Sequence, residues 1–159
     1  MAKFTDSTMN IQAQDLRIGN LLYLDLGDIK GIVKVSEIKK DVVWLTSLHG
    51  RMPIAYTNSA LKPIPLTPEI LLKAGFENIP HHTITRSMRF DLGRKRVLSI
   101  GNVGTPNEML WLCQVNDTDK TIIDDLVCVH NYDYDGYLHL HQLQNIIYDF
   151  TNQELTIEL

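Results

Sequence analysis

The chain has 159 residues, of which 44% are hydrophobic and 21% charged, and its formal net charge is −4. This composition excludes a disordered or fibrous protein, and the length is enough to bury a core without disulfides or a structural metal. The charge is uneven, because residues 97–159 carry one basic residue, Lys120, against ten acidic ones. A broad basic surface, as in most dedicated nucleic-acid-binding proteins, is therefore not expected.

The first residues lack the apolar core of a signal peptide. No apolar stretch approaches the roughly 20 residues that span a bilayer. We therefore expect a cytoplasmic protein with no membrane partner.

Residues 1–14 are polar and aperiodic, as is typical of a flexible N-terminal arm. Short runs rich in β-branched and aromatic residues follow at 21–24, 31–38, 42–48 and 53–57. Strands this short, separated by turn sequences, favour a small antiparallel barrel, because open sheet edges would need cover. We expect an SH3-like barrel over residues 15–66.

A rigid Pro-Ile-Pro connector then leads into a short helix with clear end signals. Thr67 can cap its first backbone N–H groups, and Pro68 fits the first helical position. Gly75 stands where a left-handed residue would end the helix, and Phe76 can fold back on Leu71.

Turn sequences divide the next block into an antiparallel meander, with strands at 84–92, 96–100, 108–115 and 122–130. A last helix is expected over 139–150, where an apolar stripe recurs at Leu140, Leu143, Ile147 and Phe150. A short strand at 155–159 is expected to rejoin the sheet. The fold class is α+β, with a helix–meander–helix unit over 67–159 and both helices on the same sheet face.

Three stretches resemble a known family: LRIGNLLYLDLGDIKGIVKVSEI, LKPIPLTPEILLKAGFE and LHLHQLQNIIYDFTNQELTIEL. The chain is similar to small uncharacterised proteins of Bacteroides-type bacteria and their phages and prophages, which carry PIPLTxEiLxxxGF and HELQNL-like motifs. The resemblance implies a mobile-element setting and no particular activity. Relatives often have Glu where this chain has Gln142, which argues against a catalytic carboxylate at that position.

The last helix carries a polar flank beside its apolar stripe, formed by His141, Gln144, Asn145 and Tyr148. The zinc-protease pattern H-E-x-x-H fails here, because Gln142 and Asn145 occupy its second and fifth positions. We expect the flank to tie the helix to neighbouring backbone or to a partner. No catalytic residue is assigned.

The densest set of possible metal ligands is His130, Asp133, Asp135, His139 and His141. The two last histidines would point about 200° apart on a helix, and would converge only in an extended stretch. The two aspartates are typical of a turn before glycine. We therefore expect neither a metal site nor a cofactor.

A basic strip could grip phosphates, with an aromatic ring able to stack on a base; it comprises Arg86, Arg89, Phe90, Arg94, Lys95 and Arg96. The structural alternative is a hairpin with a charged solvent face and a basic turn.

Three functional hypotheses remain. The first is a non-enzymatic binding or adaptor protein of a phage or mobile element that acts on a host component, with a host protein as its partner. The second is a nucleic-acid-binding protein that uses the small barrel and the basic strip. The third is a metal-dependent hydrolase.

Overall fold

The fold is described from a computed structural model, which covers residues 11, 13–40, 42–47, 50–55, 60–79, 87–103, 109–115, 122–128, 138–157 and 159. The chain divides into two compact units. Unit 1 comprises residues 1–65 together with 139–154, and unit 2 comprises 66–138 together with 155–159. Each unit contains one five-stranded antiparallel sheet. The expected antiparallel sheets are therefore present, and the described residues are mostly in strands, with few in helices.

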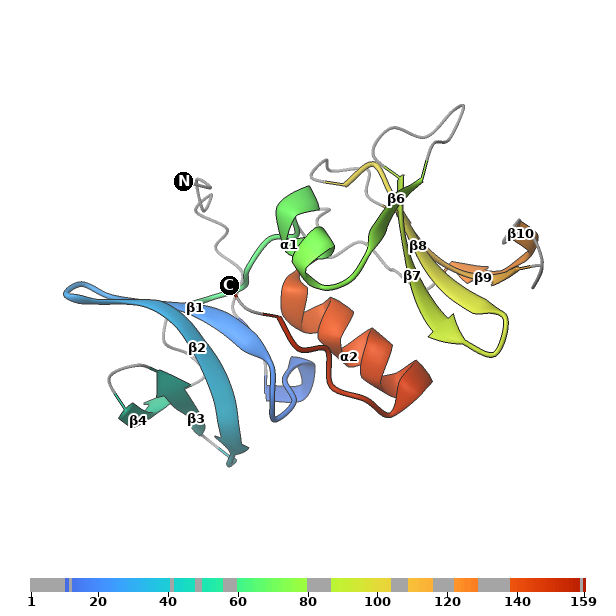
Figure 1. Ribbon diagram of the computed structural model, residues 1–159. Coiled ribbons are helices and arrows are strands. Elements are labelled where there is room, and N and C mark those ends of the chain that lie inside the picture. The colour runs from blue at the N-terminus through green and yellow to red at the C-terminus, as the bar shows by residue number, and fades with distance from the viewer. Residues whose placement is uncertain are drawn as a thin grey trace. The chain divides into compact units, whose positions relative to one another are not determined.

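The sheet of unit 1 has the strand order β4-β3-β2-β1-β5 (Figure 1). Its strands are β1 (Leu21–Leu26), β2 (Ile29–Ile38), β3 (Val42–Ser47), β4 (Gly50–Ala55) and β5 (Leu61–Lys62). Consecutive strands pair from β1 to β4, and the short β5 returns to pair with β1.

One face of this sheet forms the core of unit 1, because alternate side chains on a strand point to the same side. Leu22 lies opposite Val33, and Val35 lies opposite Leu45, across neighbouring strands. The buried apolar side chains of the sheet are Leu22, Leu24, Val33, Val35, Val43, Leu45, Ile54 and Leu61. The intervening residues lie on the opposite face, which is called the outer face below.

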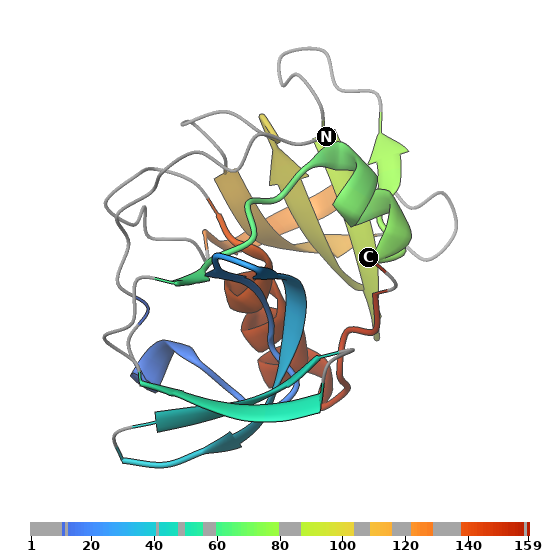
Figure 2. The ribbon, with the colours of Figure 1, turned by 90° about the vertical axis from the view of Figure 1, so that its left-hand side faces the viewer.

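The sheet is strongly bent (Figure 2). An irregularity in the pairing of β2 with β3 falls between Val35 and Glu37, and such a bulge increases local twist and bend. No ladder joins β4 to β5 within the part of the chain that the structure describes. The expected strands are therefore present at 21–55, whereas a closed barrel is not formed.

The N-terminal arm ends earlier than expected. Residues 1–10 and 12 lie outside the described ranges, but Ile11 is buried in the core of unit 1. A 3-10 turn follows at Ala13–Asp15. Residues 1–14 are polar on the whole, yet Ile11 among them packs in the core.

Unit 2 combines a short helix with a meander of strand order β10-β9-β8-β7-β6. Its elements are α1 (Pro68–Lys73), β6 (Glu77–Ile79), β7 (Ser87–Gly93), β8 (Arg96–Gly101), β9 (Met109–Val115) and β10 (Ile122–Cys128). The four expected strands thus form an antiparallel meander, and the additional strand β6 pairs with β7.

Both end signals of α1 act as expected. The Thr67 hydroxyl accepts a hydrogen bond from the Ile70 N–H at 3.3 Å. Gly75 has a φ of +88°, and the Phe76 N–H donates to the Leu71 carbonyl at 2.9 Å. This is the Schellman ending, in which a left-handed glycine lets the following N–H turn back to the helix.

The last helix, α2 (Leu140–Thr151), belongs to unit 1, which corrects its assignment to a helix–meander–helix unit. Leu143 and Ile147 of its apolar stripe are buried as expected. The physical reason for the correction lies in its polar side chains, which bond to the segment before β1. The expected strand at 155–159 is not formed at the described residues 155–157 and 159.

Within the described residues, every helix is too short or too polar to cross a membrane.

Candidate functional site

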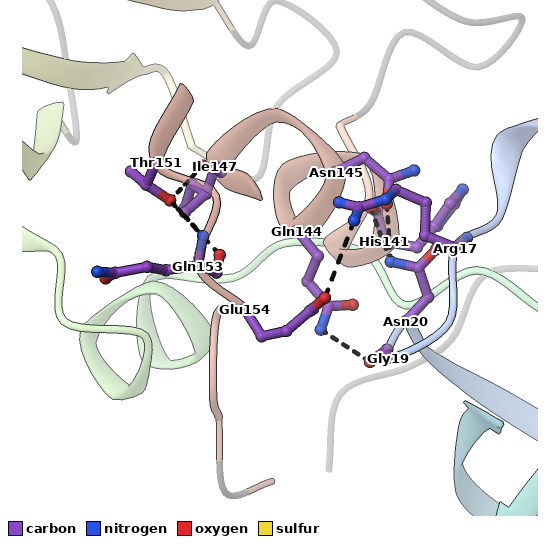
Figure 3. A network of polar contacts seen from close by, with 10 residues as sticks. All are labelled: Arg17, Gly19, Asn20, His141, Gln144, Asn145, Ile147, Thr151, Gln153 and Glu154. Carbon is purple, nitrogen blue, oxygen red and sulfur yellow. Dashed lines mark hydrogen bonds and ion pairs between the residues drawn. The ribbon is translucent and has the colours of Figure 1, made fainter. Parts of the chain in front are cut away.

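The polar flank of α2 is joined to the segment that enters β1 (Figure 3). The Gln144 side chain accepts a hydrogen bond from the Leu21 N–H at 2.8 Å and donates one to the Gly19 carbonyl at 3.4 Å. Gln144 is 2% exposed, and its amide pairs with backbone groups that the adjoining turn leaves free. We expected the flank to bond either to neighbouring backbone or to a partner, and Gln144 bonds to neighbouring backbone.

Asn145 makes a second connection of the same kind. Its side-chain N–H donates to the Asp15 carbonyl at 2.8 Å, and its side-chain oxygen accepts from the Asn20 amide at 2.9 Å. Asn20 is itself 2% exposed and also accepts a hydrogen bond from the Arg17 N–H at 2.6 Å. Because both ends of the Asn145 amide are paired, its hydrogen bonds fix the direction in which α2 meets the segment before β1.

Tyr148, the last member of the flank, carries the Arg17 guanidinium over its ring, with the guanidinium carbon 3.3 Å from the ring centroid. Arg17 also forms an ion pair with Glu154 at 3.9 Å. The side chains of the predicted partner site are therefore largely occupied within unit 1, and we do not place a partner surface there.

His139 and His141 come together, contrary to the geometry of two helical residues. His139 is the N-cap of α2 in an extended conformation (φ −109°, ψ 156°), and His141 lies in the first turn. Their rings are stacked with centroids 6.1 Å apart. Convergence was expected only for an extended stretch, and the N-cap supplies it.

The His141 side chain is fully buried, and neither of its ring nitrogens has a hydrogen-bond partner among the described residues. Burial, and secondarily the neighbouring His139, lowers the pKa of His141 to about 3. The ring is therefore neutral at pH 7 and acts as a packed core group.

The other proposed metal ligands, His130, Asp133 and Asp135, lie outside the described residues. The described part of the chain holds no cluster of three or more His, Cys, Asp or Glu side chains. His139 and His141 alone are fewer ligands than a structural or catalytic zinc site uses.

The basic strip is divided between two faces of the second sheet. Arg89 lies opposite Ser99, so the two side chains are on the same side of the sheet. Arg96 is three residues before Ser99 on the same strand, so its side chain points to the other side. Phe90 packs on Phe76, with ring centroids 5.1 Å apart. The ring expected to stack on a base is therefore in contact with the end of α1.

The tip of the strip is an exposed turn between β7 and β8. Arg94 and Lys95 have φ values of 53° and 63°, and both are exposed. Arg86 lies outside the described residues. The structural alternative, a hairpin with a basic turn, describes residues 87–101 best.

The outer face of the first sheet holds an arrangement that the sequence analysis missed. Trp44 lies between the buried Val43 and Leu45 and so points to the outer face. The Arg51 guanidinium carbon lies 4.7 Å from its ring centroid, and the Lys39 ammonium lies 5.5 Å from it. Both distances are within the range of cation–π attraction.

Glu37 joins the two cations beside the indole. Its carboxylate forms an ion pair with Lys39 at 3.0 Å and a second ion pair with Arg51. The hydrogen bond from Lys39, with Arg51 adding to it, lowers the pKa of Glu37 below its usual value. The alternation of Trp44 with apolar neighbours was the sequence signal that could have placed its side chain on the outer face.

Searches among protein-family models, curated proteins and solved structures give no match to this chain.

Proposed function

We propose that this chain is a non-enzymatic binding protein, and that its partner is held on the outer face of the first sheet. The observation that supports this is the indole of Trp44, which is partly exposed and bordered by Arg51 and Lys39. Tryptophan and arginine are over-represented among the residues that dominate protein–protein binding energy. An exposed cation–aromatic cluster on a rigid sheet suits that use.

The resemblance to proteins of Bacteroides-type bacteria and their phages supports the setting of the proposal. In that setting the chain is an accessory protein of a phage or mobile element, and the partner is a host protein in the cytoplasm. We further propose that unit 1 is an SH3-like module. Its strongly bent five-stranded sheet, in which the short β5 pairs with β1, supports that proposal.

Nucleic-acid binding through the first sheet and the basic strip is the second candidate. The exposed Arg94 and Lys95 of the β7–β8 turn favour it. The opposite directions of Arg89 and Arg96, and the packing of Phe90, count against a continuous phosphate track.

The experiment compares capture by the full chain with capture by a Trp44→Leu variant, using lysate of a Bacteroides-type host. Leucine keeps an apolar residue on the strand, so melting temperature and circular dichroism can establish that the variant folds. We expect a host protein that is retained by the wild-type chain, retained by an Asp149→Ala control, and lost with Trp44→Leu. A captured set that Trp44→Leu leaves unchanged would overturn the proposal.

A further inference from the structure

The outer face of the first sheet has a surplus of positive charge in an acidic chain. Its basic residues are placed there by strand alternation, or in one case by a contact with Trp44: Lys30, Lys34, Lys39, Arg51 and Lys62. Asp25 and Glu37 are the acidic residues of the same described face. The face therefore carries three more positive than negative charges, while the whole chain has a net charge of −4. Such a face attracts an anionic partner.

The Glu37 carboxylate shows how an anionic group can bind on this face. One of its oxygens contacts the Lys39 ammonium and the other contacts the Arg51 guanidinium. Both cations also lie over the Trp44 ring. Two cations that lie over an aromatic ring thus already bind a carboxylate.

The exposure of these three side chains would allow a carboxylate of another molecule to take the place of Glu37. The side chains are exposed, with 51% of Arg51, 55% of Lys39 and 37% of Glu37 accessible to solvent. Exposed ion pairs of long side chains contribute little to stability. A carboxylate from outside can therefore replace Glu37 at small cost, because it restores the same charge-assisted contacts.

The Trp44 indole N–H adds a further polar group. It is shielded from solvent and has no acceptor among the described residues. An unpaired shielded donor is unfavourable, so an acceptor oxygen that reached it after side-chain rearrangement would be favoured.

We propose that the partner binds this face through an acidic polypeptide segment, with an Asp or Glu carboxylate replacing Glu37 between Arg51 and Lys39. The inference rests on the proposed binding function. A polypeptide fits better than a single-stranded nucleic acid, because base stacking needs an open aromatic face and the cations already lie over Trp44. Asp25 and Glu37 also interrupt the cations that a phosphate backbone would follow.

The test uses the full chain and two labelled anions, decaglutamate and decathymidylate, with binding measured by fluorescence anisotropy at about 50 mM salt, where screening is moderate. We expect decaglutamate to bind more tightly than decathymidylate. Glu37→Gln removes the internal competitor and should tighten decaglutamate binding. Arg51→Gln should weaken it by up to about fivefold, the size expected of one exposed ion pair.

Lys73→Gln is the matched control, because Lys73 is an exposed cation on α1 in the other unit, and it should leave the affinity unchanged. Tighter binding of decathymidylate that depends on Arg51 would overturn the inference in favour of a nucleic acid. Decaglutamate binding that is absent, or that neither Glu37→Gln nor Arg51→Gln alters, would also overturn it. The capture experiment with Trp44→Leu judges the proposed function separately, because it does not depend on an acidic ligand.

Discussion

The side-chain amide of Asn145 donates a hydrogen bond to the backbone carbonyl of Asp15 at 2.8 Å, across 130 residues of sequence. The same side chain accepts from Asn20, so one residue of α2 bonds to both sides of the turn that precedes β1. This connection explains why the last helix and the first strand belong to one compact unit.

Replacing Asn145 with alanine should destabilise unit 1 by about 1–3 kcal/mol, the usual cost of leaving shielded polar groups without partners. Both Asn20 and the Asp15 carbonyl lose a bond to this side chain in the variant. Urea unfolding, followed by circular dichroism, measures the change in free energy. Asp149→Ala, an exposed substitution on the same helix, should change it by less than about 0.5 kcal/mol. Equal effects of the two substitutions would contradict the role assigned to Asn145.

Leu143→Ala should cost about 2–5 kcal/mol of unfolding free energy, because Leu143 is fully buried and the truncation leaves a cavity. The matched control is Leu72→Ala on α1, where the leucine is 49% exposed and little apolar burial is lost. Denaturant midpoints of the two variants provide the comparison. A loss below about 0.5 kcal/mol for Leu143→Ala would show that the stripe is not a core element.

The local elements of this fold were predictable because their signals lie within a few residues of one another. Thr67 and Gly75 fix the two ends of α1 by backbone chemistry that needs no distant partner. Strands β1 to β3 followed from apolar alternation between turn residues. The burial of Leu143 and Ile147 followed from helical periodicity.

The assignment of α2 to a unit was not predictable in the same way. Its apolar stripe is compatible with any apolar sheet face, whereas Gln144 and Asn145 select the turn at residues 15–21 through specific hydrogen bonds. The pairing of His139 with His141 depended on whether His139 lies inside or just before the helix. If the helix began one residue earlier, the side chains of His139 and His141 would point in opposite directions; with His139 as the N-cap, their rings stack.

The outer-face cluster was missed for a related reason. Glu37, Trp44 and Arg51 lie on three different strands, and only the register of β2, β3 and β4 brings them together. A bulge next to Glu37 shifts that register. Sequence alternation can place each residue on a face, but it does not show which residues are neighbours across strands.

Acid should destabilise the fold through His141. The pKa of this buried ring is about 3, against an ordinary value of 6.5, so the unfolded chain takes up a proton that the folded chain excludes. Stability from this group is complete above pH 6.5 and is lost progressively as the pH falls towards 3. At pH 5 the loss should be about 2 kcal/mol relative to neutral pH, measured by urea unfolding at a series of pH values.

His141→Leu removes the titrating group while keeping an apolar side chain in the core. The variant should lose less stability between pH 7 and pH 5 than the wild-type chain. The slope of its unfolding free energy against pH should correspond to about one proton fewer taken up on unfolding. Identical slopes would mean that His141 is not the buried acid-sensitive group.

Removing α2 should unfold the first sheet, although residues 66–138 of unit 2 separate α2 from that sheet in the sequence. A chain of residues 1–66 keeps all five strands of the sheet but loses the side chains that bond the Leu21 N–H and the Asp15 carbonyl. We expect this chain to give a broad, non-cooperative urea transition, because the turn before β1 loses the hydrogen bonds that fix its conformation. Adding a synthetic peptide of residues 138–155 should restore a cooperative transition, since it supplies Gln144 and Asn145 again. A peptide with both residues replaced by alanine is the control and should restore it poorly. A stable, cooperative chain of residues 1–66 in the absence of peptide would show that the sheet folds without the helix, as the domain boundary at residue 66 had implied.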